Sequence, residues 1–339
     1  MKKPEYLKNK SSISVVAPST SPIYEPYKTR NLNSIKNFEN LGHTVFESPS
    51  TKLAKQFRSN TAEIRANEFM AAYLDPNTDV VFSASGGIFM MEILPFIDFE
   101  KIKNSRPKWF VGFSDNTNLT FTLTTICEVQ SLYAPVFTEF GMNQWHKSLQ
   151  DSYDFLTGKK SQFFSYDKHQ LKSINKQEGH YLDGYNLTEK TDYHCFNFNY
   201  VKEQGILLGG CLDILQNICG TKFDNVKNYI EKYKEKGYIW FLESCDLTID
   251  MQSRALWQLK NAGWLKYAKA IIIGRPKNTT AIADIDYYHC NFCQLENLNI
   301  PVIINADFGH VPPALPMVTG AEAIIEFKDN KFSIKYLNS

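Results

Sequence analysis

The stretch Phe110-Val-Gly-Phe-Ser-Asp-Asn-Thr117 joins an apolar run to a segment with helical spacing. Residues 109–113 predict a buried strand, and apolar residues recurring on one face predict a helix over 116–127. The turn between them places Ser114 where the strand ends and the helix begins. A serine at such a turn projects its hydroxyl above the carboxyl end of a sheet, beside the free N–H groups of the helix.

The alternation of strand and helix continues on the N-terminal side of this stretch. Apolar runs and helical periodicity predict strands over 13–17, 43–47 and 79–83 and helices over 32–41 and 61–74. Alternating strands and helices are typical of a parallel sheet covered on both faces. We therefore expect an α/β domain over 1–160 that carries Ser114.

The remainder of the chain predicts a second, more strand-rich α/β domain over 196–339, after a polar linker with irregular or edge structure over 161–195. Its predicted strands cover 196–201, 205–208, 238–243, 270–274, 302–305, 321–327 and 331–336, and its helices cover 212–218, 251–262 and 284–295.

Two of these later strands end in groups that suit a serine nucleophile. Tyr238-Ile-Trp-Phe-Leu-Glu243 ends in a carboxylate, and Ile303-Ile-Asn-Ala-Asp-Phe-Gly-His310 ends in a histidine behind a glycine. A serine nucleophile needs a base, and the base needs an acid that orients it. The order Ser114, Glu243, His310 is one known chain order for such a triad. Taken singly, a helix-capping serine, a solvated glutamate and a loop histidine account for the same residues.

A further strand runs into the turn Ser85-Gly-Gly87. Glycine lets backbone amides approach a ligand closely, so this turn is a candidate for oxyanion binding at Gly87 and substrate binding at Gly86. A tight turn without a ligand is the alternative. The spacing does not match the glycine pattern of dinucleotide-binding folds, and we expect no cofactor.

Composition excludes several other classes of function. The net charge of +1 offers no field that would attract nucleic acid or an anionic membrane. No apolar stretch approaches the roughly 20 residues of a spanning helix, and the seven cysteines are typical of reduced thiols in a cytoplasmic protein. Cys290 and Cys293 lie close in sequence but lack a second pair, so we expect packing residues there and no metal site.

Several short motifs in fixed order give the chain a family resemblance. It resembles the LD-carboxypeptidase family, which includes muramoyl-tetrapeptide carboxypeptidases and microcin-immunity peptidases. The motifs are Val15-Val-Ala-Pro-Ser19, Ser85-Gly-Gly87, Val111-Gly-Phe-Ser-Asp115, Leu208-Gly-Gly-Cys-Leu212, Gly220-Thr221, Phe241-Leu-Glu243, Ile273-Gly-Arg275 and Phe308-Gly-His310 with Leu315-Pro316.

The resemblance implies an N-terminal flavodoxin-like domain, a smaller C-terminal domain, an active site between them and a homodimer. It also implies a nucleophile at Ser114, a base at His310, an acid at Glu243 and oxyanion donors at the backbone N–H groups of Gly87 and Asp115. The chain departs from the family at Cys211, where asparagine is usual, and in the bulky residues 88–90. The tryptophan loop of microcin-immunity members has only Trp145 as a candidate counterpart here.

The resulting hypothesis is a metal-free serine peptidase that removes a C-terminal D-amino acid from an L,D-linked murein tetrapeptide. An amidase cleaving a peptidyl-nucleotide or similar toxic conjugate is one alternative, and a non-catalytic peptide-binding module is another. A carboxypeptidase must bind the terminal carboxylate of its substrate, and Arg275 follows an apolar strand at the same sheet edge. Arg275 is therefore either a carboxylate clamp or part of a structural salt bridge.

Overall fold

The computed structural model describes residues 1–281 and 286–337, and its N-terminal half is built on a six-stranded sheet. Five strands are mutually parallel in the order β2-β1-β3-β4-β5, which is the flavodoxin-like order, and β14 adds to β5 in the antiparallel direction. The strands are β1 (Ser12–Val16), β2 (Thr44–Glu47), β3 (Val80–Ser83), β4 (Trp109–Val111), β5 (Ser131–Tyr133) and β14 (Met317–Thr319).

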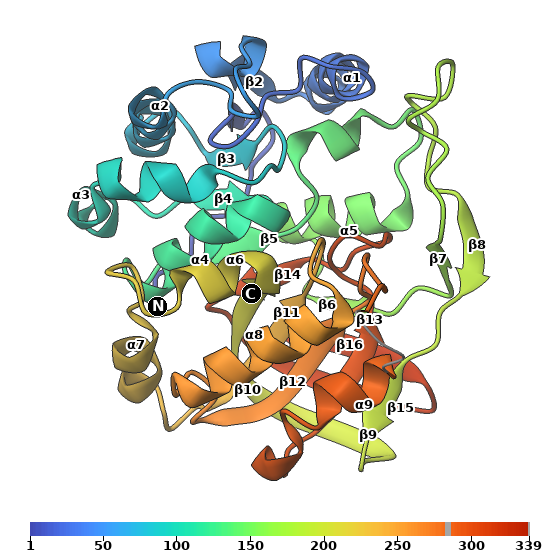
Figure 1. Cartoon of the computed structure of the whole chain (residues 1–339). Coiled ribbons are helices and arrows are strands. Elements are labelled where there is room, and N and C mark those ends of the chain that lie inside the picture. Colours follow the sequence, from blue (N-terminus) through green and yellow to red (C-terminus); the bar gives the residue numbers. More distant parts are fainter. Residues whose placement is uncertain (282–285, 338–339) are drawn as a thin grey trace.

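Helices cover this first sheet, as the alternating sequence predicts (Figure 1). They are α1 (Tyr27–Asn40), α2 (Ala62–Leu74), α3 (Phe99–Asn104), α4 (Thr117–Thr125) and α5 (Lys147–Leu156), with short 3-10 turns that include η3 (Ser114–Asn116). Every residue of α4 is buried, which is unusual for a helix with five threonines. Several of these threonines satisfy their hydroxyls locally, as Thr122 does by donating to the carbonyl of Asn118.

The C-terminal half is built on an eight-stranded mixed sheet in the order β6-β16-β15-β10-β11-β12-β13-β9. Its central strands β10 to β13 are parallel, and antiparallel strands extend it on both sides. The strands are β6 (Gln162–Phe164), β9 (His194–Phe196), β10 (Tyr200–Cys211), β11 (Tyr238–Glu243), β12 (Ala268–Gly274), β13 (Val302–Ala306), β15 (Glu322–Lys328) and β16 (Lys331–Tyr336). The helices are α6 (Leu212–Ile218), α7 (Val226–Lys232), α8 (Ile249–Asn261) and α9 (Tyr287–Phe292).

Two details of this half differ from the sequence prediction. Of the strands expected over 196–201 and 205–208, residue 196 instead ends β9, and residues 200–211 form one long strand, β10, because its polar first half pairs with β15 and leaves alternate residues exposed. The helix expected over 284–295 lies partly outside the described residues, and α9 covers its centre. The segment 161–195 contributes β6 to the second sheet and a small hairpin of β7 (Lys168–Gln170) and β8 (Leu187–Lys190).

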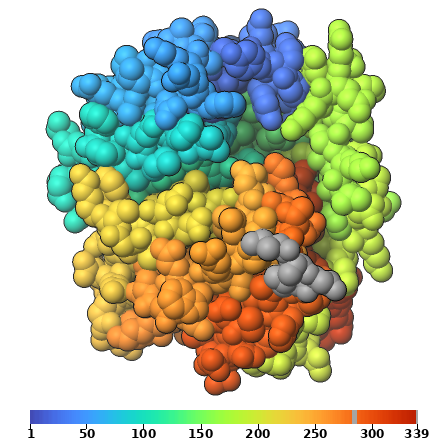
Figure 2. Space-filling view, viewed as in Figure 1, coloured from blue at the N-terminus to red at the C-terminus, as the bar shows by residue number. Residues whose placement is uncertain are grey.

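The two halves pack directly on each other (Figure 2). One cluster of buried apolar side chains continues from the first sheet into the second, so the halves share a core. The start of α4 touches the end of β10, where the N–H of Cys211 donates to the Thr117 hydroxyl at 3.0 Å. A Cβ atom at Gly210 would lie 2.6 Å from the Thr117 methyl, so glycine allows this close approach. No helix in the described ranges has the length and apolar character needed to cross a membrane.

Candidate active site

Ser114 occupies the sharp turn between β4 and the helical segment that begins with η3. Its φ of +65° lies in the left-handed region, which non-glycine residues adopt rarely and which clusters at functional sites. Gly112 permits this turn, since a Cβ atom there would lie 2.7 Å from the side chain of Asn116. The backbone therefore holds the Ser114 side chain outward above the sheet edge, as the sequence predicts.

The structure brings Ser114, His310 and Glu243 together in one chain of hydrogen bonds, which we call the Ser–His–Glu chain. Nδ1 of His310 lies 2.7 Å from Oε2 of Glu243, and Nε2 lies 2.8 Å from Oγ of Ser114. A carboxylate accepts hydrogen bonds, so Nδ1 donates to it and Nε2 of the neutral ring accepts the Ser114 proton. These three residues, from distant parts of the sequence, have the mutual geometry of a nucleophile, a base and an orienting acid.

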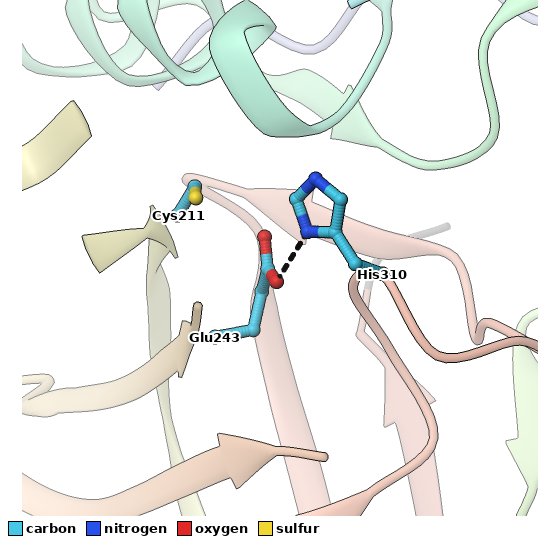
Figure 3. Close-up of side chains that lie close together, drawn as sticks. All are labelled: Cys211, Glu243 and His310. Atoms are coloured by element: carbon cyan, nitrogen blue, oxygen red, sulfur yellow. Dashed lines mark hydrogen bonds and ion pairs between the residues drawn. The ribbon is translucent and has the colours of Figure 1, made fainter. Parts of the chain in front are cut away.

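Parallel strands position the members of this chain. Glu243 is the last residue of β11, His310 follows β13, and Ser114 follows β4, so all three project from carboxyl ends of strands. Figure 3 shows the Glu243 carboxylate between Cys211, at the end of β10, and the His310 ring. Gly309 has a φ of +93°, and a Cβ atom there would lie 2.6 Å from Oε2 of Glu243. Glycine before His310 therefore lets the loop pass over the carboxylate.

Tyr133 is a member of the site that sequence reasoning missed. It ends β5 and is buried, and its hydroxyl donates to Oε1 of Glu243 while accepting the N–H of Ser114 at 3.1 Å. Burial, together with the nearby Glu243 charge, raises the pKa of Tyr133 well above its ordinary value. Tyr133 therefore remains a neutral donor to Glu243. Its place at the end of a strand beside Ser114 was the signal that could have identified Tyr133 as part of the site, but tyrosine is common in buried strands.

The electrostatic surroundings of His310 favour the protonated ring. Burial lowers the pKa of His310, but the Glu243 charge, the nearby Cys245 side chain and the hydrogen bond that the ring donates to Glu243 outweigh burial and raise the pKa to about 10. The carboxylate of Glu243 is itself fully buried, so its interaction with an imidazolium is weakly screened by solvent. The pair is thus arranged to stabilise the positive charge that a base acquires.

The predicted oxyanion donors flank Ser114. Gly86 packs against it, since a Cβ atom there would lie 3.4 Å from Cβ of Ser114, and Gly87 has a φ of +156° and no room for a side chain beside Ser19. Asp115 follows Ser114, and its buried carboxylate accepts from the Ser19 hydroxyl and from the N–H of Met90 at 2.9 Å. These contacts fix the turn around the Ser114 hydroxyl. The oxyanion role of the Gly87 and Asp115 amides stays a prediction.

A cavity of about 610 Å³ opens beside the His310 ring. Both halves of the chain line it, with Phe113 and Tyr27 from the first and His310, Lys277 and Tyr287 from the second. Trp145 does not belong to its lining. The Trp145 ring packs on Phe140 in the apolar core, with ring centroids 5.1 Å apart. It is therefore not placed to stack on a ligand in this cavity.

Arg275 also borders this cavity, but its guanidinium is turned into the protein. It forms an ion pair with the buried carboxylate of Asp307, and Nη1 and Nη2 also donate to the backbone carbonyls of Asn305, Val311 and Pro313. Only 6% of the Arg275 side chain is exposed. Of the two roles that the sequence left open, this geometry favours the structural salt bridge.

The atoms Cys211 Sγ, one Glu243 oxygen and one His310 nitrogen lie within 4.8 Å of one another, a spacing that a metal ion could bridge. Both oxygens of Glu243 already accept hydrogen bonds, from Tyr133 and His310, and both ring nitrogens of His310 are engaged. A cation here would have to displace these contacts. Burial raises the pKa of the Cys211 thiol well above its ordinary value, which disfavours the thiolate that metals bind. The Ser–His–Glu chain therefore accounts for this cluster of side chains better than a metal site does.

The sequence and fold of this chain match known proteins over nearly its whole length. Sequence profiles of the LD-carboxypeptidase N-terminal and C-terminal domains match residues 13–134 and 204–325. Microcin C7 self-immunity protein MccF of Escherichia coli is 26% identical over 334 residues, covering 95% of this chain and 93% of its own.

Solved structures agree with this assignment at the level of the fold. The MccF-like protein from Bacillus anthracis has a TM-score of 0.84 at 24% identity, with 100% of each chain covered. MccF in complex with glutamyl sulfamoyl guanosine has a TM-score of 0.82 at 23% identity, with 98% of each chain covered. Because the profiles of both LD-carboxypeptidase domains match this chain in order, the chain belongs to the LD-carboxypeptidase family.

Proposed function

We propose that this protein is a serine peptidase that removes a C-terminal D-amino acid from an L,D-linked murein tetrapeptide in the cytoplasm. The observation that supports it most is the Ser–His–Glu chain, with its 2.8 Å and 2.7 Å contacts and a nucleophile held at a positive φ. Membership of the LD-carboxypeptidase family supports the class of reaction. The homodimer implied by the family resemblance remains part of the proposal.

In the acylation step, Oγ of Ser114 attacks the carbonyl carbon of the scissile bond and transfers its proton to Nε2 of His310. The negative charge on the carbonyl oxygen is stabilised by the backbone N–H groups of Gly87 and Asp115. Glu243 holds the ring through Nδ1 and stabilises the imidazolium. His310 then donates the proton to the leaving nitrogen, and the free D-amino acid departs.

In the deacylation step, a water molecule takes the place of the leaving amine. His310 removes a proton from this water, which attacks the ester carbon of the acylated Ser114. Collapse of the second tetrahedral intermediate breaks the bond to Oγ, and His310 returns its proton to Ser114. The products are the shortened peptide and the free enzyme, with no net change in protonation of the Ser–His–Glu chain.

Turnover of a defined L,D-linked tetrapeptide, measured by release of the free D-amino acid, tests this proposal. Ser114→Ala should lower kcat by at least about 10³-fold, because the substitution removes the nucleophile of a triad whose members act as a unit. Circular dichroism and thermal unfolding of the variant would show that the fold is kept. Near-normal turnover by a folded Ser114→Ala protein would reject Ser114 as the nucleophile.

A second candidate is an amidase that cleaves a peptidyl-nucleotide or similar conjugate. The relative MccF is a microcin C7 self-immunity protein, and its solved complexes contain aminoacyl sulfamoyl nucleosides. A cavity of about 610 Å³ is large enough for a ligand of that size. Parallel assays with the tetrapeptide and an aminoacyl adenylate analogue separate the two candidates, since the preferred substrate should have the higher kcat/KM.

The third candidate is a peptide-binding module that kept the fold without turnover. A fluorophosphonate reagent distinguishes it, because such reagents react with activated serines and do not require the natural substrate. Labelling at Ser114 that is lost in His310→Ala would support an enzyme. Absence of labelling in the folded wild-type protein would favour the binding module.

A further inference from the structure

The cavity beside His310 lies on the side of the Ser–His–Glu chain where a leaving group must depart. Phe113, Gly309 and His310 line it, whereas Gly87 and Asp115, the proposed oxyanion donors, are absent from its lining. In the proposed mechanism His310 protonates the leaving nitrogen, so this nitrogen must come within hydrogen-bond distance of the ring. The portion of the substrate that departs therefore extends into this cavity.

Four lysine and arginine side chains line the cavity, of which two are engaged within the protein. The buried Arg30 pairs with Glu139 at 3.2 Å, and Arg275 pairs with Asp307. Lys176 and Lys277 are exposed at its rim, and neither has a carboxylate within ion-pair distance among residues 1–281 and 286–337. These two lysines are the cations of the cavity that a ligand can reach without breaking an ion pair.

Lys277 lines the same cavity as His310 and contacts Cys245. Its Nζ lies 3.6 Å from Sγ of Cys245, and the nearby Cys245 side chain contributes to the raised pKa of His310. Lys277 is three residues beyond β12, whose end packs against Glu243 through Gly274. The backbone that supports Glu243 therefore also brings the Lys277 ammonium to the leaving-group side of the His310 ring.

We propose that Lys277 forms an anion subsite that binds the negatively charged group carried by the leaving portion of the substrate. This inference rests on the proposed function and adds the residue that recognises the substrate. In an amino acid leaving group, the carboxylate is separated from the leaving nitrogen by one carbon. An anion held at Lys277, in the cavity that the His310 ring also lines, therefore positions that nitrogen close to the ring that must protonate it.

The same chemistry would serve the phosphoryl or sulfamoyl group of a nucleotide conjugate, which also carries charge or strong acceptors near the scissile bond. An ammonium is a compact point charge and accepts either anion. Lys277 is thus expected to select for charge, while other residues of the cavity select the rest of the leaving group. Peptide and nucleotide substrates must be compared to identify the natural source of the anion.

Paired substrates that differ only in charge test the subsite. One peptide ends in a free D-alanine carboxylate, and its partner ends in D-alanine amide. We expect the wild-type protein to prefer the free acid in kcat/KM, and Lys277→Met to lower this acid-to-amide preference by about tenfold, the effect of losing one partly desolvated ion pair. Lys277→Arg keeps the charge and should retain most of the preference.

Lys176→Met is the matched control. It removes one exposed charge from the rim of the same cavity, at the loop that joins β7 and β8. If the effect comes from the general potential of the cavity, both methionine variants will lower the acid preference equally. The subsite is supported only if Lys277→Met has the larger effect, and equal effects reject it.

Equilibrium binding separates the subsite from the proposed reaction. Calorimetry on Ser114→Ala protein, which cannot turn over, should show tighter binding of the free acid than of the amide, and Lys277→Met should remove the difference. Cleavage of both peptides without an acid preference would overturn the subsite and leave the peptidase proposal intact.

If neither peptide is bound or cleaved, the proposed peptide substrate is wrong, and an aminoacyl adenylate decides the subsite. In that arm, Lys277→Met should weaken binding of the adenylate to Ser114→Ala protein by about tenfold, relative to the Lys176→Met control. Unchanged binding would reject Lys277 as the anion receptor for either source.

Discussion

The Tyr133 hydroxyl joins the two ends of the Ser–His–Glu chain, because it donates to Oε1 of Glu243 and accepts the N–H of Ser114 at 3.1 Å. Glu243 therefore has a hydrogen-bond donor on each oxygen, Tyr133 on one and His310 on the other. With both oxygens fixed, the carboxylate has one orientation toward the ring. The same hydroxyl restrains the strained backbone of the nucleophile.

We predict that Tyr133→Phe lowers kcat by about 10–100-fold, since a hydrogen bond to a charged group contributes about 1.5–3 kcal/mol. The variant should also react more slowly with a fluorophosphonate, which reports on Ser114 without the natural substrate. Tyr153→Phe is the control, because the Tyr153 hydroxyl bonds His43 at 2.8 Å in the N-terminal core. Equal losses in both variants would indicate a general effect of removing a buried hydroxyl.

The raised pKa of His310 predicts the direction of the pH dependence. Only the neutral ring can act as a base, and the pKa is raised from 6.5 to about 10, so kcat/KM should rise with pH to an apparent pKa above 6.5. Glu243→Gln removes the charge that raises this pKa, so the midpoint should move to lower pH as the maximal rate falls. A wild-type midpoint at or below 6.5 would contradict this account.

The same pair also makes stability depend on pH. Because the folded protein binds the His310 proton more tightly than the unfolded chain, the pair contributes its full stability below the ordinary pKa of 6.5. That contribution is lost as pH rises through the folded pKa. Unfolding of wild type and Glu243→Gln should therefore differ most at acidic and neutral pH and converge in alkali.

The fold could be predicted from the sequence where its pattern was local. The apolar run before Ser114 and the helical spacing after it correspond to β4 and α4, and strand–helix alternation gave the parallel first sheet. What could not be predicted depends on pairing between distant segments. The pairing of β14 with β5 places residues 317–319 in the N-terminal sheet, and no local pattern encodes that partner. The polar residues 202–204 also belong to β10 only because they pair with β15.

The candidate site likewise has some residues that the sequence indicates and others that only the structure shows. Ser114, Glu243 and His310 are each at the end of an apolar run, and a residue type with known chemistry at that position is visible in sequence. Tyr133 and Lys277 act through contacts across the fold, with Glu243 in one case and Cys245 in the other. The sequence left Arg275 as either a carboxylate clamp or a structural salt bridge, because it could not show that Asp307 already pairs with the arginine.

That ion pair leads to the last prediction, which concerns Arg275. Asp307 has no exposed surface, and burial raises its pKa while Arg275 and hydrogen bonds from Tyr166 and Tyr193 lower it. Arg275→Ala would leave this carboxylate buried without its cation, which should lower the free energy of unfolding by about 3–5 kcal/mol. Chemical denaturation measures the loss.

Two comparisons make the Arg275 prediction specific. Arg106→Ala removes an exposed arginine that lies 3.7 Å from Asp79, and it should lower the free energy of unfolding by less than about 1 kcal/mol. Adding Asp307→Asn to Arg275→Ala should recover part of the lost stability, because the amide leaves no buried charge. Any change in KM from Arg275→Ala should then be equal for the free-acid and amide peptides. A KM increase confined to the free acid, in a protein of undiminished stability, would instead make Arg275 the carboxylate clamp.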